Sequence, residues 1–416
     1  MGNIERPRGT RDFSPAEMHM RDYVEDIISG VFESYNYRKI ATPTFEHSEL
    51  FRLKSGEEIE EHMFVFRDKS NRELCLRPEA TASVCRMFSE ELQMMQRPLK
   101  LYYSCPMFRY EEPQKGRYRE FWQTGIELIG AETPESDAEV IAIASECLKR
   151  VGIKSRLEIN HLGILREFLS HLGIKGKMQD KALALIDRKN FDELSGIVDD
   201  ENFLKLTKLN GGRDAIDKAD SILKDYPSAA SALKELSDVI SWLDAMGIEY
   251  SLNLGIARGL EYYTGTVFEI RVQDLGAQNQ ICGGGRYDEL IGLFSGVKTS
   301  AVGFAFGFDR IMNAIELQGV KIPEKNTDVV IAPVNPELRL DAAKIASGLR
   351  GRFIVDLDLM NRKLGKILEY AGNTKARYVV IVGPEDLKNQ SVTVRNMMTG
   401  EQKKVKIEDI EKEIIS

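Results

Sequence analysis

The sequence contains few cysteines, histidines and tryptophans, and their spacing argues against disulfide bonds and bound structural metals. Its five histidines show no spacing typical of metal ligands, and its five cysteines include no CxxC pair. These patterns argue against a disulfide framework and a structural metal site, and they favour reduced thiols in a cytosolic core. The cysteines are Cys75, Cys85, Cys105, Cys147 and Cys282.

Long apolar runs are also missing. The longest ones, such as YVVIV at 378–382, have the length of strands and are too short to cross a bilayer. The opening stretch MGNIERPRGTRDF contains no apolar segment, so no signal peptide is expected. We therefore expect a cytoplasmic protein without membrane contact.

Positive charge is not in excess. The 416 residues include 57 Lys and Arg against 65 Asp and Glu, which gives a net charge of −8. This composition is ordinary for a soluble globular protein of about two to four domains, and bulk charge gives no indication of nucleic acid. From Lys321 onward, however, 17 basic residues stand against 14 acidic ones. The C-terminal part is therefore the better candidate for contacting a polyanion.

Helical and strand-like patterns divide the chain into four segments. Residues 1–160 and 247–322 combine helices with strands of an antiparallel sheet, whereas residues 161–246 show helical spacing with almost no alternation. We interpret this middle segment as an all-helical insertion. Residues 323–416 alternate strands with helices, which predicts a separate α/β domain with a largely parallel sheet. The predicted fold class is α/β and multidomain.

Two helix starts can be predicted from local signals. Ser14 and Pro15 are expected to open a helix that continues to about Tyr35, because proline suits the first turn. The stretch TASVCRMFSEEL is expected to form a helix capped by Thr81 or Ser83.

A charged hairpin spans FRYEEPQKGRYREFWQTGIELIG, residues 108–130. Strand alternation places Phe121, Gln123 and Glu127 on one face, and Arg109 points the same way as Met107 on the preceding strand. Arg109 could hold an anionic ligand while the amide and carboxylate meet an NH-bearing group. A surface hairpin laced with salt bridges explains the pattern equally simply, and on the hairpin alone it is the favoured interpretation.

The stretch AVGFAFGFDRIM places small residues on one face of a strand. Gly303, Ala305 and Gly307 share this face, which leaves room for a flat group on the sheet. Arg310, at the start of the next helix, could stack on that group or pair with a phosphate. Tight packing of a helix on the sheet is the alternative, and is about as good an explanation.

Three further stretches carry polar residues. LRPEAT provides Glu79 and Thr81 as acceptors for an ammonium group, and CGGGRYDEL is neither a P-loop nor a dinucleotide fingerprint. In ARGLEYYTG, neighbouring tyrosines are expected to point to opposite faces, so only one of Tyr262 and Tyr263 should line a given pocket.

Together these stretches resemble a known family. FRYEEPQKGRYREFWQ resembles motif 2 of class II aminoacyl-tRNA synthetases, GFAFGFDR resembles motif 3, and the segment around Pro43 stands where the dimer-forming motif 1 is expected. RGTRDF, LRPEAT, ARGLEYYTG and GGGRYDEL resemble stretches of histidyl-tRNA synthetases, with ARGLEYYTGTVFEI closest to the archaeal form. The resemblance covers essentially the whole chain. It implies an antiparallel catalytic core flanked by helices, a helical insertion and a C-terminal anticodon-binding domain.

The resemblance also implies roles for individual residues. Arg109 and Arg258 would be catalytic, contacting the α-phosphate from two sides. Glu79, Thr81 and Gln123 would hold the ammonium of histidine, and Glu127 and Tyr263 would bracket its imidazole. The implied histidine-binding set is Glu79, Ala80, Thr81, Arg109, Gln123, Glu127, Arg258, Tyr262, Tyr263 and Tyr287. The implied ATP-binding set is Arg109, Glu111, Phe121 and Arg310, with Glu111 at the adenine amino group and Phe121 and Arg310 around the ring.

The implied partners are L-histidine, ATP, tRNA(His) and a second copy of the chain in a homodimer. Mg²⁺ is expected to bridge the ATP phosphates, with no metal bound by the protein alone. The helical insertion would clamp the acceptor arm of the tRNA. The basic cluster Lys403, Lys404 and Lys406 is interpreted as a solvated helix face, not as a reader of bases.

Two alternatives remain open. Catalytically silent relatives serve as regulatory subunits of ATP phosphoribosyltransferase, but they tend to lose the histidine-specific stretch and the C-terminal domain. The present chain retains Arg258, Tyr262 and Tyr263 and continues to Ser416. The other alternative is a class II synthetase for threonine, proline or glycine, which would lack a carboxylate–tyrosine pair suited to imidazole.

Overall fold

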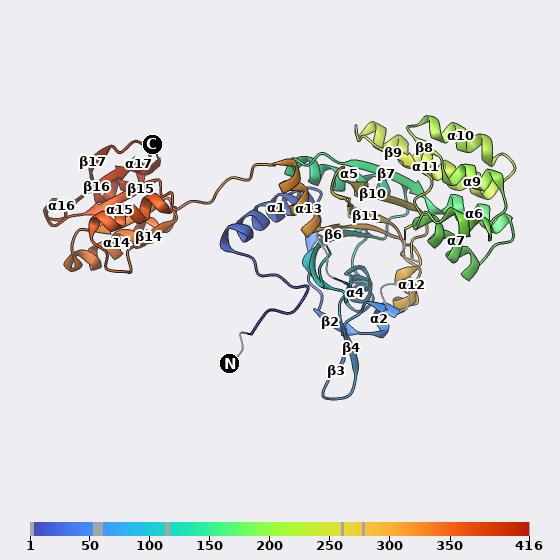
Figure 1. Ribbon diagram of the computed structural model, residues 1–416, viewed down its shortest axis with the longest axis horizontal. Coiled ribbons are helices and arrows are strands. Elements are labelled where there is room, and N and C mark those ends of the chain that lie inside the picture. The colour runs from blue at the N-terminus through green and yellow to red at the C-terminus, as the bar shows by residue number, and fades with distance from the viewer. Residues whose placement is uncertain (1–3, 53–60, 113–116, 259–261, 277–278, 416) are drawn as a thin grey trace. The chain divides into compact units, whose positions relative to one another are not determined.

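The computed structural model describes residues 4–52, 61–112, 117–258, 262–276 and 279–415 (Figure 1). The chain forms two compact units, Met1–Ile322 and Pro323–Ser416. Parts of two motif stretches, residues 113–116 and 259–261, lie outside the described residues. No helix in the described ranges is long and apolar enough to span a membrane.

The first unit opens with helix α1, Pro15–Ser34, as predicted. Ser14 caps it, because its side chain accepts from the Glu17 amide while the Glu17 carboxylate accepts from the Ser14 amide. Val24, Ile28, Val31 and Phe32 recur at helical spacing and are buried, so one stripe of α1 packs into the core.

The core of this unit is a nine-stranded sheet in the order β1-β5-β6-β12-β11-β10-β7-β9-β8. All neighbouring strands in it are antiparallel except β1 with β5 and β7 with β9. The predicted antiparallel core is therefore confirmed. The strands are β1 (Arg38–Lys39), β5 (Leu99–Phe108), β6 (Glu120–Ile129), β7 (Arg156–His161), β8 (Asn210–Gly211), β9 (Ser251–Asn253), β10 (Thr266–Arg271), β11 (Gln280–Arg286) and β12 (Ala301–Gly307).

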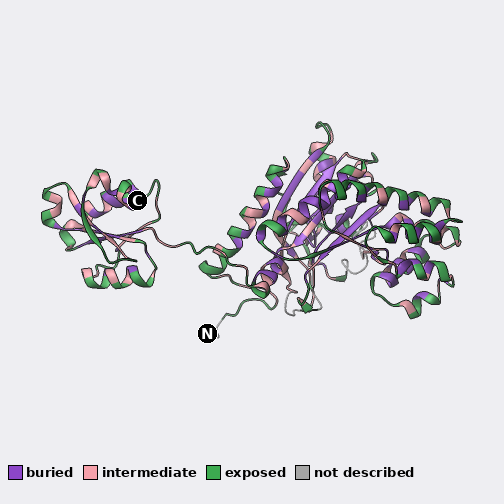
Figure 2. Cartoon of the chain, turned by 90° about the horizontal axis from the view of Figure 1, so that it is seen from above, coloured by how far each residue is buried: buried purple, intermediate pink, exposed green. Residues whose placement is uncertain are grey.

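One face of the sheet is covered by helices. Helix α5, Pro134–Val151, packs across β6, β10, β11 and β12, and α1 packs against α5. The bulky face of β12 belongs to this side, where Phe304 meets the Phe32 ring of α1 at 6.0 Å between centroids. Figure 2 shows the buried strands flanked by exposed helix surfaces. Helix α13, Phe308–Gln318, follows β12 directly.

A smaller sheet precedes the hairpin. It has the order β2-β4-β3, with β2 (Phe45–His47), β3 (Val65–Arg67) and β4 (Glu73–Leu76), and α2 (Glu49–Arg52) lies between β2 and β3 in the chain. Helix α4, Thr81–Met87, follows, continues as a π-helical turn over Phe88–Leu92 and packs against α12, Leu290–Ser295.

The predicted cap of this helix is wrong. Ala80 occupies the N-cap position without a side-chain bond. Instead, Glu79 accepts hydrogen bonds from the amides of Thr81 at 2.5 Å and Ala82 at 3.0 Å. A carboxylate one residue earlier thus satisfies the free amides of the first turn, which leaves the Thr81 hydroxyl available for another partner.

Helices α6 to α11 form the region between β7 and β9. They are α6 (Leu162–His171), α7 (Lys177–Asp187), α8 (Phe191–Ser195), α9 (Glu201–Thr207), α10 (Asp214–Leu223) and α11 (Pro227–Ala245). Helix α11 packs against α5 and α6, which ties this region to the sheet. The two-residue strand β8 also lies here and pairs with β9.

The second unit contains a five-stranded sheet in the order β14-β13-β15-β16-β17. Only β13 with β14 and β13 with β15 are parallel, because β16 and β17 continue as antiparallel neighbours, so the prediction of a largely parallel sheet is correct for half of it. The elements are β13 (Val329–Pro333), α14 (Arg339–Leu349), β14 (Val355–Leu357), α15 (Leu364–Asn373), β15 (Tyr378–Val382), α16 (Pro384–Lys388), β16 (Ser391–Asn396), β17 (Gln402–Lys406) and α17 (Ile410–Ile415).

The lysine cluster lies on strand β17 and not on a helix, so the interpretation of these lysines as a solvated helix face is wrong. Lys403, Lys404 and Lys406 pair with Glu413, Asp386 and Glu408, while Val405 between them is buried. Alternation of exposed lysine with buried valine is a strand pattern, and lysines suit an edge strand because they oppose pairing with other chains.

Candidate active site

The face of the nine-stranded sheet that points away from α5 has a floor of small residues. Residues paired across antiparallel strands share a face, and the register pairs Gln123 with Gly307, Gly125 with Ala305 and Glu127 with Gly303. On the other side of β12, Ala305 pairs with Gly283 and Gly303 with Gly285, and Gly283 in turn pairs with Glu269. Large polar side chains on β6 and β10 thus face each other across a strip of glycine and alanine.

This strip must be small because charged groups lie directly over it. A Cβ atom on Gly303 would overlap the Glu127 carboxylate, and one on Gly283 would overlap the Arg258 guanidinium. The glycines therefore leave room for a carboxyl group and a guanidinium group over two parts of the same floor.

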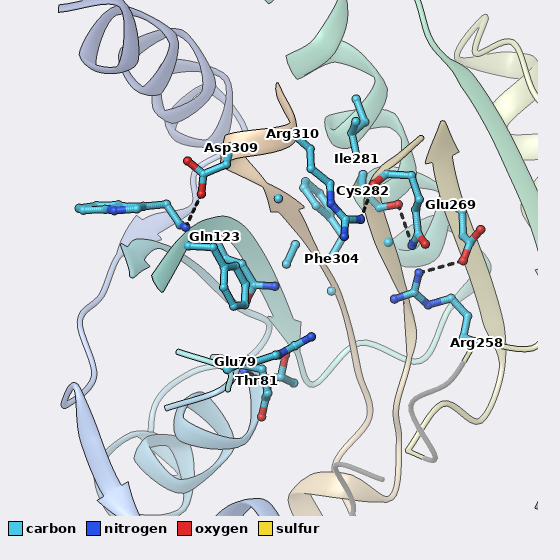
Figure 3. Close-up of a pocket in the computed structure, with 18 of the residues that line it drawn as sticks. Glu79, Thr81, Gln123, Arg258, Glu269, Ile281, Cys282, Phe304, Asp309 and Arg310 are labelled. Atoms are coloured by element: carbon cyan, nitrogen blue, oxygen red, sulfur yellow. Dashed lines mark hydrogen bonds and ion pairs between the residues drawn. The ribbon is translucent and has the colours of Figure 1, made fainter. Parts of the chain in front are cut away.

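A cavity of about 430 Å³ opens above this floor. Figure 3 shows Glu79 and Thr81 on one side of it, Arg310 on another and Arg258 beside Glu269. All but one of the site residues predicted from the sequence line this cavity, and Ala80 is the exception. Those that line it are Glu79, Thr81, Arg109, Glu111, Phe121, Gln123, Glu127, Arg258, Tyr262, Tyr263, Tyr287 and Arg310.

Glu127 forms the acidic wall of the cavity. It is 1% exposed and accepts hydrogen bonds from the Thr81 hydroxyl at 2.8 Å and from the Tyr287 hydroxyl. Burial raises the pKa of Glu127 to about 8, against the opposing effect of these two donors. The carboxyl group of Glu127 therefore binds its proton more tightly than an exposed glutamate does.

Glu79 is a second buried acid on this wall. Burial raises its pKa, although the amides of Ala82 and Thr81 and the charge of Arg109 act in the opposite direction. Each carboxylate oxygen can accept more than one hydrogen bond, so the two amide bonds leave acceptor capacity toward the cavity.

The tyrosines do not follow the predicted alternation. Both Tyr262 and Tyr263 line the cavity, with ring centroids 4.8 Å apart and planes at 53°. They lie in an irregular segment before β10, where the alternation of a strand does not apply. Tyr287 completes the cluster, with its ring 5.8 Å from that of Tyr262.

Arg258 dominates the opposite wall. Its Nη1 donates to Glu269 at 3.2 Å, and its guanidinium lies 5.5 Å from the Tyr263 ring centroid. Although burial opposes its charge, the neighbouring Tyr263 and Glu269 raise the pKa of Arg258. Its φ of 55° is left-handed, a conformation that non-glycine residues rarely adopt and that is concentrated at functional sites.

Arg109, Arg310 and Phe121 form the third wall. Arg109 donates to the Pro78 carbonyl at 2.9 Å and lies 5.3 Å from the Phe121 ring centroid, while Arg310 donates to the Gln280 carbonyl at 2.7 Å. Burial lowers the pKa of Arg310, and the positive charges of neighbouring arginines lower it further. An anion in the cavity would relieve this repulsion.

Both units of the chain match known family models. A family model described as "Histidyl-tRNA synthetase" matches residues 9–311, and one described as "Anticodon binding domain" matches residues 328–416. The chain belongs to the histidyl-tRNA synthetase family. The prediction of this family from the sequence motifs is confirmed.

The relatives agree with this assignment. The chain is 44% identical over 98% of its length to proteins named "Histidine--tRNA ligase" from Methanocaldococcus jannaschii and Archaeoglobus fulgidus, and it covers 98% of each. A crystal structure of histidyl-tRNA synthetase from Nostoc sp. PCC 7120 superimposes with a TM-score of 0.84 at 27% identity, covering 100% of this chain and 99% of the other. The expected resemblance to the archaeal form is also confirmed.

One structural neighbour bears on the regulatory alternative. A protein from Bacillus halodurans, titled as an ATP phosphoribosyltransferase regulatory subunit/histidyl-tRNA synthetase, has a TM-score of 0.79 at 27% identity. The match covers 91% of the present chain and 98% of the Bacillus halodurans chain. The shared fold alone does not separate the two activities, so the residues of the cavity must do so.

Several cavity residues were missed by the sequence interpretation. Arg117 lies 2.6 Å from Glu111, and Glu269 accepts from both Arg258 and Arg271. Glu269 and Arg271 stand two residues apart on a strand, a signal that could have been read by parity. Asp309 also lines the cavity, and its position beside Arg310 gave no hint of this role.

Proposed function

We propose that this chain is a histidine–tRNA ligase. It activates L-histidine with ATP to histidyl-adenylate and pyrophosphate, and then transfers histidine to the 3′ end of tRNA(His). The observation that carries the proposal is one cavity with two unlike walls, a buried Glu127–Tyr287 pair and a set of guanidinium groups. The family match across both units supports it.

On the first wall we place the amino acid. Glu79, Thr81 and Gln123 offer acceptors to the ammonium group, and Glu127 accepts the N–H of one imidazole nitrogen. Tyr263 serves the other nitrogen, while Tyr262 and Tyr287 form walls. The Tyr287 hydroxyl donates a hydrogen bond to Glu127, so the role of Tyr287 is to hold that carboxyl group in place.

This wall supports selection of histidine. An amino acid with an apolar side chain would offer no N–H to Glu127 and no ring nitrogen to Tyr263, and such a loss can discriminate by about 10⁴-fold. The same reasoning separates histidine from threonine, proline and glycine, none of which carries an N–H other than that of the amino group to offer to Glu127.

On the second wall we place MgATP. Arg109 and Arg258 contact the α-phosphate from two sides, Glu111 accepts from the adenine amino group, and Phe121 and Arg310 enclose the ring. Mg²⁺ bridges the outer phosphates as part of the substrate. An oxygen of the histidine carboxylate attacks the α-phosphorus, and the bond from phosphorus to the pyrophosphate oxygen breaks.

Fixed cations are the main catalytic device in this proposal. Negative charge builds on the phosphoryl oxygens in the transition state, and guanidinium groups already held by Glu269 and backbone carbonyls need little rearrangement to stabilise it. We assign the catalytic role to Arg258 and Arg109 for this reason.

The remaining assignments concern partners. The second unit binds the anticodon loop of tRNA(His), whose splayed bases can be stacked on and bonded at their edges. Residues 161–246 clamp the acceptor arm, and a homodimer forms through the segment around Pro43. The protein works in the cytoplasm.

Pyrophosphate exchange with single amino acids tests the function. Labelled pyrophosphate should enter ATP when histidine is added and not with threonine, proline or glycine. Exchange with one of those amino acids would assign a different synthetase. Absence of exchange with all amino acids would favour the regulatory alternative.

A further inference from the structure

A segment near the N-terminus crosses the end of the β5–β6 hairpin. The Gly9 carbonyl accepts from the Arg119 amide at 2.9 Å and from the Glu120 amide at 3.4 Å. Gly9 has a φ of +87°, and a Cβ atom there would lie 2.7 Å from the Arg119 side chain, so glycine is required for this close approach. The segment thereby adds hydrogen bonds where β6 begins.

Arg11 connects this segment to two other parts of the cavity wall. Its guanidinium lies 3.5 Å from the ring centroid of Tyr118, and it donates to the Asp309 carboxylate at 2.5 Å. Tyr118 and Asp309 both line the cavity. One planar side chain therefore stacks on the hairpin and binds the start of α13 at the same time.

Asp309 receives three hydrogen bonds. Besides Arg11, the Arg21 guanidinium donates to it at 2.7 Å, and the Trp122 amide donates to its second oxygen at 3.0 Å. Asp309 precedes Arg310, and Trp122 follows Phe121. The carboxylate thus bridges the backbones next to the two side chains proposed to enclose adenine.

We propose that Arg11 is a positioning residue for the nucleotide half of the cavity. It fixes Tyr118 and Asp309 relative to each other, and through them the separation of Phe121 and Arg310. Arg11 contacts Tyr118 and Asp309, whereas the acids of the amino-acid half lie just before α4 (Glu79) and on β6 (Glu127). This inference rests on the proposed ATP site.

The test compares Arg11→Met with the matched control Arg8→Ala. Arg8 belongs to the same segment and pairs with Glu112 on the same hairpin, but both side chains are more than two-thirds exposed. Arg11→Met should raise the KM for ATP in pyrophosphate exchange by about tenfold, as expected for a lost hydrogen bond to a charged group. The KM for histidine should stay within about twofold, because the amino-acid wall is unchanged.

Two further variants separate positioning from folding. Arg11→Lys keeps the charge beside Asp309 without the flat stack, so it should fall between the wild type and Arg11→Met. Tyr118→Leu removes the stack without touching Asp309, and should raise the KM for ATP in the same direction. Equal rises in both KM values for Arg11→Met, or an unchanged KM for ATP, would overturn the proposal.

Amide hydrogen exchange keeps this inference distinct from the proposed function. In Arg11→Met the Arg119 and Glu120 amides should exchange faster than in the wild type, and in Arg8→Ala they should not. If the wild type shows no histidine-dependent exchange of pyrophosphate, the proposed function is refuted. If the Arg119 and Glu120 amides keep their protection in Arg11→Met, the positioning role is refuted.

Discussion

The two halves of the cavity treat charge in opposite ways. In the amino-acid half, the buried Glu127 is held by the uncharged donors Thr81 and Tyr287, and burial raises its pKa to about 8. In the nucleotide half, Arg258 forms an ion pair with Glu269, and Tyr263 and Glu269 raise the pKa of Arg258 although burial opposes its charge. The acid of the first half is thus held by hydroxyl donors, whereas the guanidinium of the second half is held by a carboxyl group.

This difference matches what each half must do. A carboxyl group that titrates near neutral pH can recognise an imidazole in either state. It accepts a hydrogen bond from a ring N–H when it is ionised and donates one to a ring nitrogen when it is protonated. A guanidinium that never loses its proton can stabilise charge that appears only in the transition state.

Arg258→Ala should have the largest effect. Adenylate formation should fall by about 10³-fold, the loss typical of a preorganised electrostatic contact, while histidine affinity changes far less. Stopped-flow or exchange kinetics together with histidine titration would measure both. Arg150→Ala, which removes an exposed ion pair with Glu146, provides the control. Equal losses in binding and turnover would contradict the role given to Arg258.

Glu127→Ala should act on the other half. Histidine affinity should fall by about 100-fold through loss of a buried hydrogen bond to a charged or polar ring, with ATP affinity nearly unchanged. Calorimetric titration with each ligand separately would show this. Glu139→Gln, whose carboxylate contacts Lys100, should leave both affinities unchanged. An unaltered affinity for histidine in Glu127→Ala would refute the assignment.

Gly303→Ala should disturb the floor beneath Glu127. The new methyl group would lie 2.5 Å from the Ile126 carbonyl oxygen and would overlap the carboxylate, so we expect a loss of about 2 kcal/mol in unfolding free energy. Denaturant unfolding would measure it. Gly30→Ala on α1, where a Cβ atom meets nothing within 4 Å, should be neutral or slightly stabilising. A fully stable Gly303→Ala would show that the floor is not tightly packed.

The smallest effect, measured over one pH unit, concerns the pH dependence of stability. Glu127 has a higher pKa in the folded chain, about 8, than its ordinary value of 4.5, so its contribution to stability is complete below pH 4.5 and is lost as pH rises toward 8. Glu127→Gln cannot ionise and should not show this loss. Between about pH 6 and pH 7, its unfolding free energy should gain about 1 kcal/mol relative to the wild type. Parallel stability curves would mean that burial does not raise this pKa.

Local patterns predicted one side of the site well. The parity of strand residues placed Gln123 and Glu127 on one face of their strand, and Gly303, Ala305 and Gly307 on one face of theirs, because side-chain direction along a strand depends only on neighbouring residues. The structure then paired these two faces. The family stretches similarly brought together residues that lie far apart in the chain. These predictions relied on patterns that a single sequence contains.

The rest depends on non-local structure. Parity could have placed Glu269 and Arg271 on one face of their strand, but only the register of β10 with β11 brings that face to the site. Asp309 enters through a hydrogen bond from Arg11, far away in the chain, which no spacing in the sequence reveals. The error for Tyr262 and Tyr263 arose from applying strand alternation to an irregular segment. The left-handed backbone of Arg258 is equally invisible, because the sequence there offers no glycine at that position.

The most direct test of the central claim is a crystal structure with histidine and ATP bound together. The account predicts the imidazole against the Glu127 carboxylate and the α-phosphate between the guanidinium groups of Arg109 and Arg258. An imidazole bound elsewhere, or a nucleotide whose α-phosphate contacts neither arginine, would contradict it.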